Sequence, residues 1–252
     1  MRGTVVIVHG IGEHSGRHAR LATRLRAWGW APVAYDHRGH GASGGRRGVL
    51  RRGDDLITDL ATIVDTTRPA DGTPFLLFGH SMGGLVAAQF VADAVRPVDG
   101  LVLSSPALAG KLTTAQRVKL ALGRALAPDL AVPNGFDPST LSHDPEVARA
   151  YRADPLVHDR VSAKLAQSLL DAGPRVLARA ADWPVPTLLL WAGDDHLVSP
   201  TGSADFASRA PAEVVESHVF ATLRHEIMNE TDPEPVFTVL GVWLDRRFPL
   251  TV

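Results

Sequence analysis

Residues 75–91 read Phe-Leu-Leu-Phe-Gly-His-Ser-Met-Gly-Gly-Leu-Val-Ala-Ala-Gln-Phe-Val. The first four residues are an apolar run typical of a buried strand, and the residues after the glycine pair form a mostly apolar helix. Between them, Gly79 and Gly83 flank Ser81 in a Gly-x-Ser-x-Gly pattern. Because glycine has no side chain, both arms of a tight turn can pack closely while the serine takes a strained conformation. The stretch therefore predicts a sharp strand-to-helix turn that lifts a serine hydroxyl off the edge of a sheet.

The composition is that of a globular protein with one large domain. The chain has 252 residues, of which 45% are hydrophobic, and a formal net charge of −1. Such a balance argues against a nucleic-acid partner, because there is no basic excess to displace phosphate counterions. Cysteine is absent, which excludes disulfides and thiolate chemistry. We expect no cofactor and no metal, since His37 and His40 lie in a glycine-rich loop without a ligand set.

The chain carries no apolar stretch near the roughly 20 residues that span a bilayer. Its first residues have the pattern of a strand and not of a secretory signal. We therefore expect a cytoplasmic protein, with peripheral contact at membranes as an option.

Strand-like and helix-like segments alternate along the chain, which predicts an α/β fold with a mostly parallel sheet and helices on both faces. The expected strands are 5–8, 31–35, 75–78, 101–104, 187–191 and 214–219, and the expected helices include 17–28, 56–64, 82–94 and 234–247. From 108 to 183 the pattern shows only helical stretches interrupted by prolines. We predict a core formed by residues 1–107 and 184–252, with residues 108–183 as a helical cap over the carboxyl edge of the sheet.

A neutral serine needs a base, usually histidine, which in turn needs a carboxylate to orient it. In enzymes built on this turn the chain order is serine, acid, histidine, each after a strand. His225 follows the last expected strand, and Asp194 and Asp195 follow the one before. We predict Ser81, Asp195 and His225 as the catalytic residues, with Asp194 as the alternative acid.

An oxyanion formed at such a serine is stabilised by backbone N–H groups. One donor is expected from Met82, directly after the nucleophile, and a second from Ile11 in the loop after the first strand.

Several stretches together resemble the monoacylglycerol lipase and lysophospholipase group of α/β-hydrolases. They are His-Gly-Ile-Gly-Glu-His-Ser-Gly-Arg (9–17), Asp-His-Arg-Gly-His-Gly-Ala-Ser-Gly-Gly (36–45), Gly-His-Ser-Met-Gly-Gly (79–84), Leu-Ser-Ser-Pro-Ala (103–107), Ala-Tyr-Arg-Ala-Asp-Pro-Leu-Val (150–157), Asp-Asp-His-Leu-Val (194–198) and His-Glu-Ile-Met-Asn-Glu (225–230). The resemblance implies an α/β-hydrolase fold with a cap, and hydrolysis of glycerol monoesters of fatty acids. It supports the same triad and oxyanion donors, and it implies that Glu13, Arg17 and Tyr151 hold the glycerol hydroxyls.

Members of this group usually carry two strands before the one that here begins near residue 5. The resemblance therefore implies either a trimmed start or a smaller sheet with a different edge.

Other functions remain as alternatives. Lysophospholipids or short-chain esters are alternative substrates for the same site. A nicotinamide-dependent oxidoreductase is a different class, since Gly10-Ile11-Gly12 follows a strand and Asp36 ends the next one. However, Ser15 stands where that fingerprint needs its last glycine, and the pattern leaves the serine turn unexplained.

Residues 118–126, Val-Lys-Leu-Ala-Leu-Gly-Arg-Ala-Leu, have the spacing of an amphipathic helix. Its apolar side is expected either to pack on the loops of the core or to line an acyl tunnel and rest on a membrane or micelle surface.

Overall fold

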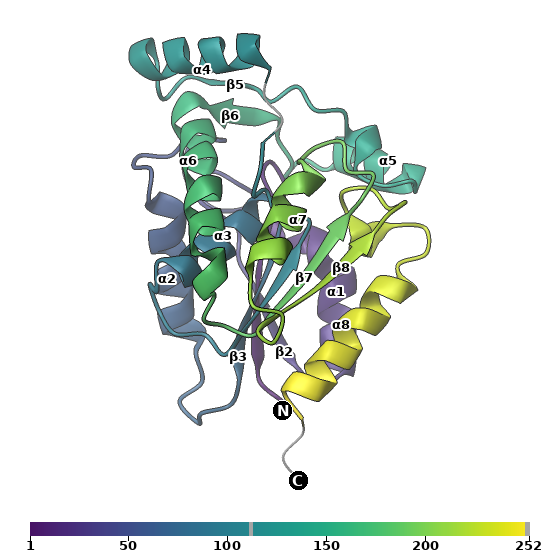
Figure 1. The fold of residues 1–252 in the computed structure, drawn as a ribbon. Coiled ribbons are helices and arrows are strands. Elements are labelled where there is room, and N and C mark those ends of the chain that lie inside the picture. The colour runs from purple at the N-terminus through teal and green to yellow at the C-terminus, as the bar shows by residue number, and fades with distance from the viewer. Residues whose placement is uncertain (111–112, 250–252) are drawn as a thin grey trace.

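The computed structural model describes residues 1–110 and 113–249. Six strands form one sheet in the order β2-β1-β3-β4-β7-β8, and every neighbouring pair is parallel (Figure 1). The strands are β1 (Thr4–Val8), β2 (Ala31–Ala34), β3 (Phe75–His80), β4 (Gly100–Ser104), β7 (Thr187–Ala192) and β8 (Val215–Phe220). The predicted fold class, an α/β-hydrolase with a mostly parallel sheet, is confirmed.

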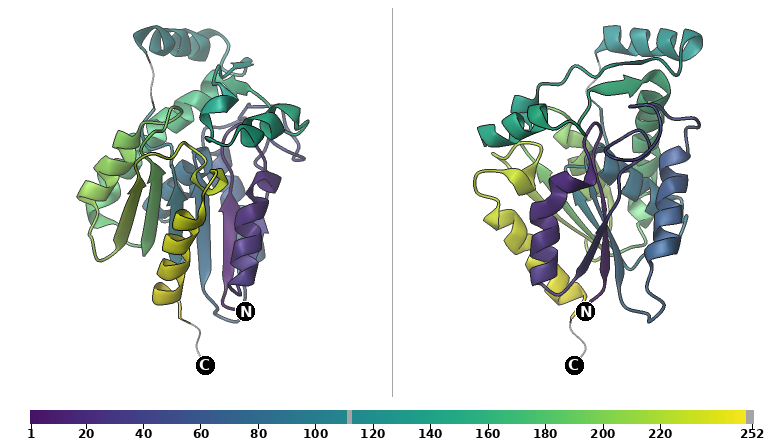
Figure 2. Two further views of the ribbon diagram at one scale, coloured as in Figure 1. Left: turned by 90° about the vertical axis from the view of Figure 1, so that its right-hand side faces the viewer. Right: turned by 180° about the vertical axis from the view of Figure 1, so that it is seen from behind.

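Helices cover both faces of this sheet, as the alternating pattern predicts (Figure 2). They are α1 (Ala19–Ala27), α2 (Asp55–Thr67), α3 (Met82–Ala92), α4 (Thr114–Leu126), α5 (Pro145–Ala153), α6 (Ala163–Arg179), α7 (Pro200–Arg209) and α8 (Glu234–Arg247). One buried cluster joins the sheet to α2, α3, α6 and α7, and a second joins it to α1 and α8. Because β1, β3, β4 and β7 lie between these two layers, their residues are buried throughout and mostly apolar.

The edge of the sheet beside β1 is formed by β2 alone. Within the described residues, the main sheet has no antiparallel strand. The described sheet therefore ends in a parallel strand at each edge, β2 on one side and β8 on the other.

The segment between β4 and β7 differs from the prediction of a purely helical cap. It contains two short strands, β5 (Ala131–Pro133) and β6 (Arg160–Ser162), which pair in an antiparallel manner. Three-residue strands are too short to show the period-2 alternation by which strands are recognised, and Pro133 discourages the assignment further. The expectation that residues 108–183 contain no strand was therefore wrong.

The helices of this segment do not all lie above the sheet. In Figure 1, α4, α5 and the β5–β6 pair lie over one end of it, whereas α6 descends beside α3. Leu165 and Val176 of α6 are buried in the same cluster as the α3 side chains. Helix α6 therefore belongs to the packing of the core as much as to the cap.

The segment at 118–126 forms the greater part of α4, which begins earlier, at Thr114, with a capping box between Thr113 and Gln116. The helix buries none of its described side chains. Across the described parts of the chain, no helix is long and apolar enough to cross a membrane.

Candidate active site

The turn between β3 and α3 holds Ser81 in a strained conformation. Its φ of 54° lies in the left-handed region that side chains other than glycine rarely adopt. A Cβ added to Gly83 would lie 2.1 Å from the carbonyl oxygen of Val8, and one added to Gly79 would lie 2.5 Å from that of Gly83. These contacts explain the two glycines of the motif, because a side chain at 83 would push the turn away from β1 and a side chain at 79 would push the start of α3 away from β3.

His225 lies in the loop after β8 and is buried against Asp195, which follows β7. The distance between His225 Nδ1 and Asp195 Oδ2 is 2.7 Å. Since a carboxylate only accepts hydrogen bonds, Nδ1 carries a proton, which leaves Nε2 of a neutral imidazole as an acceptor. Burial lowers the pKa of His225, but the charge and hydrogen bond of Asp195 outweigh it and raise the pKa above its usual value.

The structure separates the two adjacent aspartates. Oδ1 of Asp195 accepts hydrogen bonds from the amides of Leu197 and Val198, at 2.8 and 3.0 Å, which fixes the orientation of the carboxylate. Asp194 is exposed, and its carboxylate contacts His196 at 3.1 Å. Only Asp195 is therefore in a position to orient His225.

Ser81 and His225 line one pocket of about 200 Å³. Glu13, Tyr151 and the two expected oxyanion donors, Ile11 and Met82, line the same pocket. Met82 is the first residue of α3, so its amide belongs to the turn whose N–H groups have no partner within the helix. Apart from Asp195, which acts through His225, and Arg17, every residue that the sequence singled out for the site lines this pocket.

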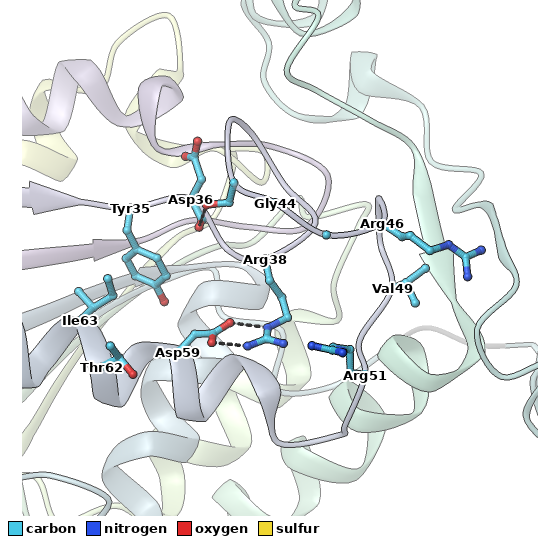
Figure 3. A pocket seen from close by; sticks show the side chains of 12 residues that line it. Tyr35, Asp36, Arg38, Gly44, Arg46, Val49, Arg51, Asp59, Thr62 and Ile63 are labelled. Atoms are coloured by element: carbon cyan, nitrogen blue, oxygen red, sulfur yellow. Dashed lines mark hydrogen bonds and ion pairs between the residues drawn. The ribbon is translucent and has the colours of Figure 1, made fainter.

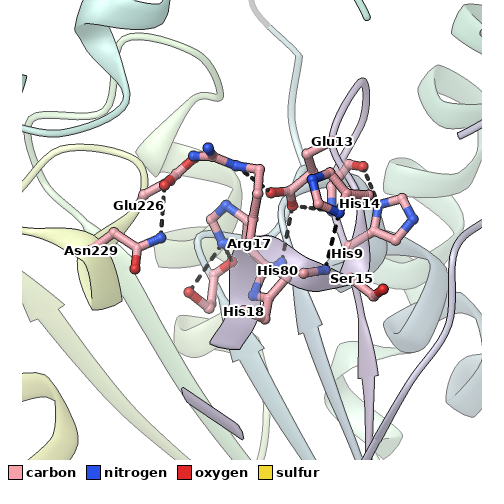
Figure 4. Close-up of polar contacts among 12 residues, drawn as sticks. His9, Glu13, His14, Ser15, Arg17, His18, His80, Glu226 and Asn229 are labelled. Atoms are coloured by element: carbon pink, nitrogen blue, oxygen red, sulfur yellow. Dashed lines mark hydrogen bonds and ion pairs between the residues drawn. The ribbon is translucent and has the colours of Figure 1, made fainter. Parts of the chain in front are cut away.

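Arg17 lies behind the pocket wall and holds two carboxylates (Figure 4). Its Nε donates to Glu13 at 3.2 Å, and its second terminal nitrogen donates to Glu226 at 2.5 Å. The guanidinium carbon lies 4.8 Å from the centre of the Tyr151 ring. Arg17 therefore contacts Glu13, Glu226 and Tyr151 of the pocket wall but is not itself one of the lining residues.

Glu13 is an acid that stays ionised although it is buried. It accepts hydrogen bonds from the amide of Gly10, at 2.5 Å, and from His18, at 3.1 Å (Figure 4). Burial alone would raise the pKa of its carboxyl, but the interactions with His18 first, and then with His80 and Arg17, hold that pKa well below its usual value. These bonds shape the loop that carries Ile11.

The pocket residues that the sequence analysis missed include two polar ones, Glu226 and Asn134. Glu226 lies directly after His225, and its second oxygen accepts a hydrogen bond from Asn229 at 2.8 Å. Asn134 follows β5, and its buried Nδ2 has no hydrogen-bond partner among the described residues. No local sequence pattern distinguishes Asn134. It reaches the site only because the segment that contains β5 packs over the end of the sheet.

Four buried histidines at or beneath the site, His9, His37, His40 and His80, have pKa values that are lowered chiefly by burial. The pKa of His9 falls to about 4, and those of His40 and His80 fall to about 3. His9 accepts a hydrogen bond from the amide of His37 at 2.9 Å, and the rings of His9 and His37 lie 4.5 Å apart. The described residues contain no group of three or more potential ligands that could hold a metal ion.

We predict that these histidines make the protein less stable below pH 6.5. When the pH falls, a histidine whose pKa is lowered by folding takes up its proton in the unfolded chain at a higher pH than in the folded protein. Its contribution to the free energy of unfolding is therefore complete above pH 6.5 and is lost as the pH falls below that value. Between pH 7 and pH 5 His9, His40 and His80 should each remove about 2 kcal/mol from the free energy of unfolding. Urea unfolding at several pH values measures this loss.

His40→Gln should make the free energy of unfolding less dependent on pH in this range, because it removes about one of the protons that the chain takes up on unfolding. His196→Gln, which changes an exposed histidine, serves as the control and should leave the slope unchanged. A free energy of unfolding that stays constant from pH 7 to pH 5 would contradict the prediction.

Comparison with known proteins relates this arrangement to hydrolases along nearly the whole chain. A monoacylglycerol lipase of Mycolicibacterium smegmatis is 36% identical over 96% of this chain and 88% of its own length. Phospholipase YtpA of Bacillus subtilis is 31% identical over 96% and 95% of the two chains. The crystal structure of a monoacylglycerol lipase from Paleococcus ferrophilus superposes with a TM-score of 0.89 at 33% identity, covering 98% of this chain and 95% of the other.

The family match covers residues 1–232 and so includes the Ser81 turn, Asp195 and His225. The matched residues span both the sheet and the cap. The chain therefore belongs to the Hydrolase_4 family of α/β-hydrolases, described as serine aminopeptidase S33.

Proposed function

We propose that this carboxylic ester hydrolase cleaves monoacylglycerol to glycerol and a free fatty acid through an acyl-enzyme on Ser81. The observation that carries the proposal is that His225, which is hydrogen-bonded to Asp195, lines the same pocket as the strained Ser81. The lipases and the phospholipase among its relatives support a lipid ester as the substrate.

In this mechanism Nε2 of His225 takes the proton of Ser81 as its oxygen attacks the ester carbonyl. The amides of Met82 and Ile11 stabilise the negative charge on the carbonyl oxygen. The alcohol leaves with the proton from His225, and a water molecule activated by the same imidazole then releases the fatty acid. Asp195 holds the ring in the required tautomer throughout.

Two unpaired polar groups of the pocket support an alcohol with free hydroxyls. The hydroxyl of Tyr151 and Nδ2 of Asn134 are buried without a hydrogen-bond partner among the described residues. A buried polar group that lacks a partner costs about 1–3 kcal/mol, so a substrate that supplies one is favoured. We assign Glu13 and Tyr151 to the glycerol hydroxyls, and Arg17 to positioning them.

A peptide substrate is less well supported. An amino-terminal peptidase needs an acidic group to receive the α-ammonium of its substrate, and the pocket offers Glu13 and Glu226. Both carboxylates already pair with Arg17. An additional ammonium group would have to compete with a buried guanidinium.

The size of the pocket favours short-chain esters as a second candidate. Its volume of about 200 Å³ lies below the roughly 300–1,000 Å³ of common ligand pockets. A long acyl chain would therefore have to extend beyond it.

A substrate panel tests the proposal. We expect higher kcat/KM for 1-monoacylglycerols than for diacylglycerols, lysophospholipids, short-chain alkyl esters and aminoacyl amides. The methyl ester of the same fatty acid is the matched control, because it keeps the acyl chain and lacks the glycerol hydroxyls. A higher kcat/KM for lysophospholipids, for short esters or for aminoacyl amides would contradict the monoacylglycerol assignment.

We also propose that α4 contacts lipid surfaces. Val118, Leu122 and Leu126 recur at intervals of four, and their residues are 54%, 57% and 82% exposed. Within the described residues, none that lines the catalytic pocket comes from α4, so the expectation of an acyl tunnel along this helix has no support in the pocket. An exposed apolar stripe beside cationic side chains is typical of helices that lie on membranes.

Leu122→Glu is expected to weaken co-sedimentation with phospholipid vesicles and to leave hydrolysis of a water-soluble ester unchanged. Val242→Glu is the matched control, because Val242 is equally exposed, at 57%, but lies on α8. Equal vesicle binding by both variants, or no binding by the unchanged protein, would contradict the proposal.

A further inference from the structure

A second cavity, of about 680 Å³, lies outside the catalytic pocket. It is formed by the end of β2, the loop after it and one side of α2 (Figure 3). The two cavities share no lining residue among those described. Its volume lies within the range of common small-molecule sites.

The floor of this cavity is apolar. Tyr35 comes from the residue after β2, Val49 from the loop and Ile63 from α2, and all three side chains line the space (Figure 3). Tyr35 and Ile63 are only partly buried, although they pack against the main core cluster. This floor would suit an aliphatic group.

The arginines around the floor differ in their partners. The Arg38 guanidinium forms a bidentate pair with Asp59, at 2.5 and 2.6 Å, and also lies 3.2 Å from Asp55. Arg46 and Arg51 are exposed and have no carboxylate partner among the described residues. Figure 3 shows the Arg51 side chain directed toward Arg38, whereas the Arg46 side chain points away from both. A guanidinium group without an ion-pair partner at the rim, as at Arg51, favours an anion.

The remaining acid of the cavity does not cancel this charge by an ion pair. The carboxylate of Asp36 accepts hydrogen bonds from the amides of Ser15 and Ala42, each at 2.8 Å. It is therefore already used in holding the loop. The loop itself is fixed from the other side, because the amide of Ser162 on β6 donates to the carbonyl of Gly48 at 2.9 Å.

The backbone that carries the two arginines is anchored as well. The carbonyl of Arg46 accepts from the amide of Val49 at 3.1 Å, and the amide of Arg51 donates to Asp55 at 2.7 Å. Lys164 on α6 donates to the carbonyl of Arg51 at 3.0 Å. A wall held in this way loses little further backbone freedom when a ligand binds.

A buried hydroxyl at the back of the cavity lacks a partner. Tyr35 is one of its lining residues, and its hydroxyl oxygen is buried with no hydrogen bond among the described residues. In Figure 3 this hydroxyl is directed toward Thr62 and Asp59. Burial, with the charge of Asp59 adding to it, raises the pKa of Tyr35 and keeps the hydroxyl protonated, so it remains a donor.

We propose that this cavity is a second, non-catalytic binding site for an amphiphilic anion. The acidic head lies at Arg51, with Arg46 on the same loop adding positive charge, and the aliphatic part lies on Tyr35, Val49 and Ile63. A fatty carboxylate and a lipid phosphate monoester share this chemistry. The inference does not depend on the reaction at Ser81, because it uses no residue of the catalytic pocket.

Isothermal titration calorimetry of the full chain with four probes tests the proposal. Decanoate and decyl phosphate represent the two sources, decanol supplies the chain without the charge, and inorganic phosphate supplies a charge without the chain. We expect one or both of the charged amphiphiles to bind at least about tenfold more tightly than decanol and inorganic phosphate, and to bind more weakly as salt is added.

Arg46→Gln/Arg51→Gln should weaken that binding about tenfold or more and leave ester hydrolysis unchanged. Arg26→Gln/Arg209→Gln is the matched control, because it removes two exposed arginines that form no ion pair within the described residues. Tyr35→Phe, which removes only the hydroxyl, should weaken binding to a smaller extent.

A decanoate that carries a photoreactive diazirine locates the probe. We expect cross-links to the segments that contain Tyr35, Val49 or Ile63, and their loss in the Arg46→Gln/Arg51→Gln variant. Cross-links confined to the catalytic pocket would overturn the proposal. So would equal affinity in the variant and the unchanged protein, equal affinity for decanol and both charged amphiphiles, or the absence of binding.

Discussion

Ser81→Ala will reduce kcat for ester hydrolysis by a factor of about 10⁴ or more, with the fold intact. The hydroxyl oxygen forms the acyl-enzyme, and no other side chain of the pocket can replace it next to His225. The backbone of the turn is held by Gly79 and Gly83 against β1, so it does not depend on the serine side chain. Steady-state kinetics with a soluble ester measures the loss, and circular dichroism with thermal unfolding checks the fold.

Ser105→Ala is the matched control for this substitution. Ser105 also has a positive φ, of 42°, and is buried, but it does not line the catalytic pocket. We expect the control to keep most of its activity. Near-normal hydrolysis by the Ser81→Ala variant would refute the nucleophile assignment.

Asp195→Asn should lower kcat by about 10⁴, whereas Asp194→Asn should change it by less than about tenfold. An amide at position 195 can donate to His225 Nδ1 and thereby favour the tautomer whose Nε2 carries the proton. That tautomer cannot accept the proton of Ser81. Asp194 is exposed and contacts only His196 among the contacts described for its side chain, so it has no such effect.

The comparison of these two neighbours is informative because both substitutions remove one negative charge at nearly the same place. An equal loss in both variants would show that charge, and not the hydrogen bond at 2.7 Å, supports the base. A larger loss for Asp194→Asn would contradict the assignment.

The sequence predicts the core because its elements carry strong local signals. Strand β3 is a continuous apolar run, and the glycines after it are required by contacts of 2.1–2.5 Å in the folded turn. The last helix begins at Glu234 and ends at Arg247, as predicted. The order of strands and loops then indicates which acid and which histidine meet the serine.

Other features depend on contacts between distant segments and leave little local signal. The strands β5 and β6 are three residues each and exist because they pair with one another. Helix α7, for which no element was predicted, begins with Pro200 after a loop and buries Phe206 against Trp183. Arg17 pairs with Glu13 and Glu226 and does not line the pocket, and its contact with the substrate stays a prediction.

The second cavity could not be predicted from the sequence at all. Its arginines look like a solvated basic loop in the chain, and the positions of Tyr35 and Ile63 depend on how β2 and α2 pack. The difference between the arginines becomes visible only when Arg38 is seen to pair with Asp59 and Asp55 while Arg51 forms no ion pair within the described residues.

Covalent labelling with a fluorophosphonate tests the central claim, the activation of Ser81 by His225, most directly. Such a reagent reacts only with a serine whose proton is taken by a base. We predict a single adduct, located on Ser81 by peptide mass spectrometry, that is lost in a folded His225→Ala variant. An adduct on another residue, no adduct, or labelling of Ser81 at the same rate without His225 would contradict the account.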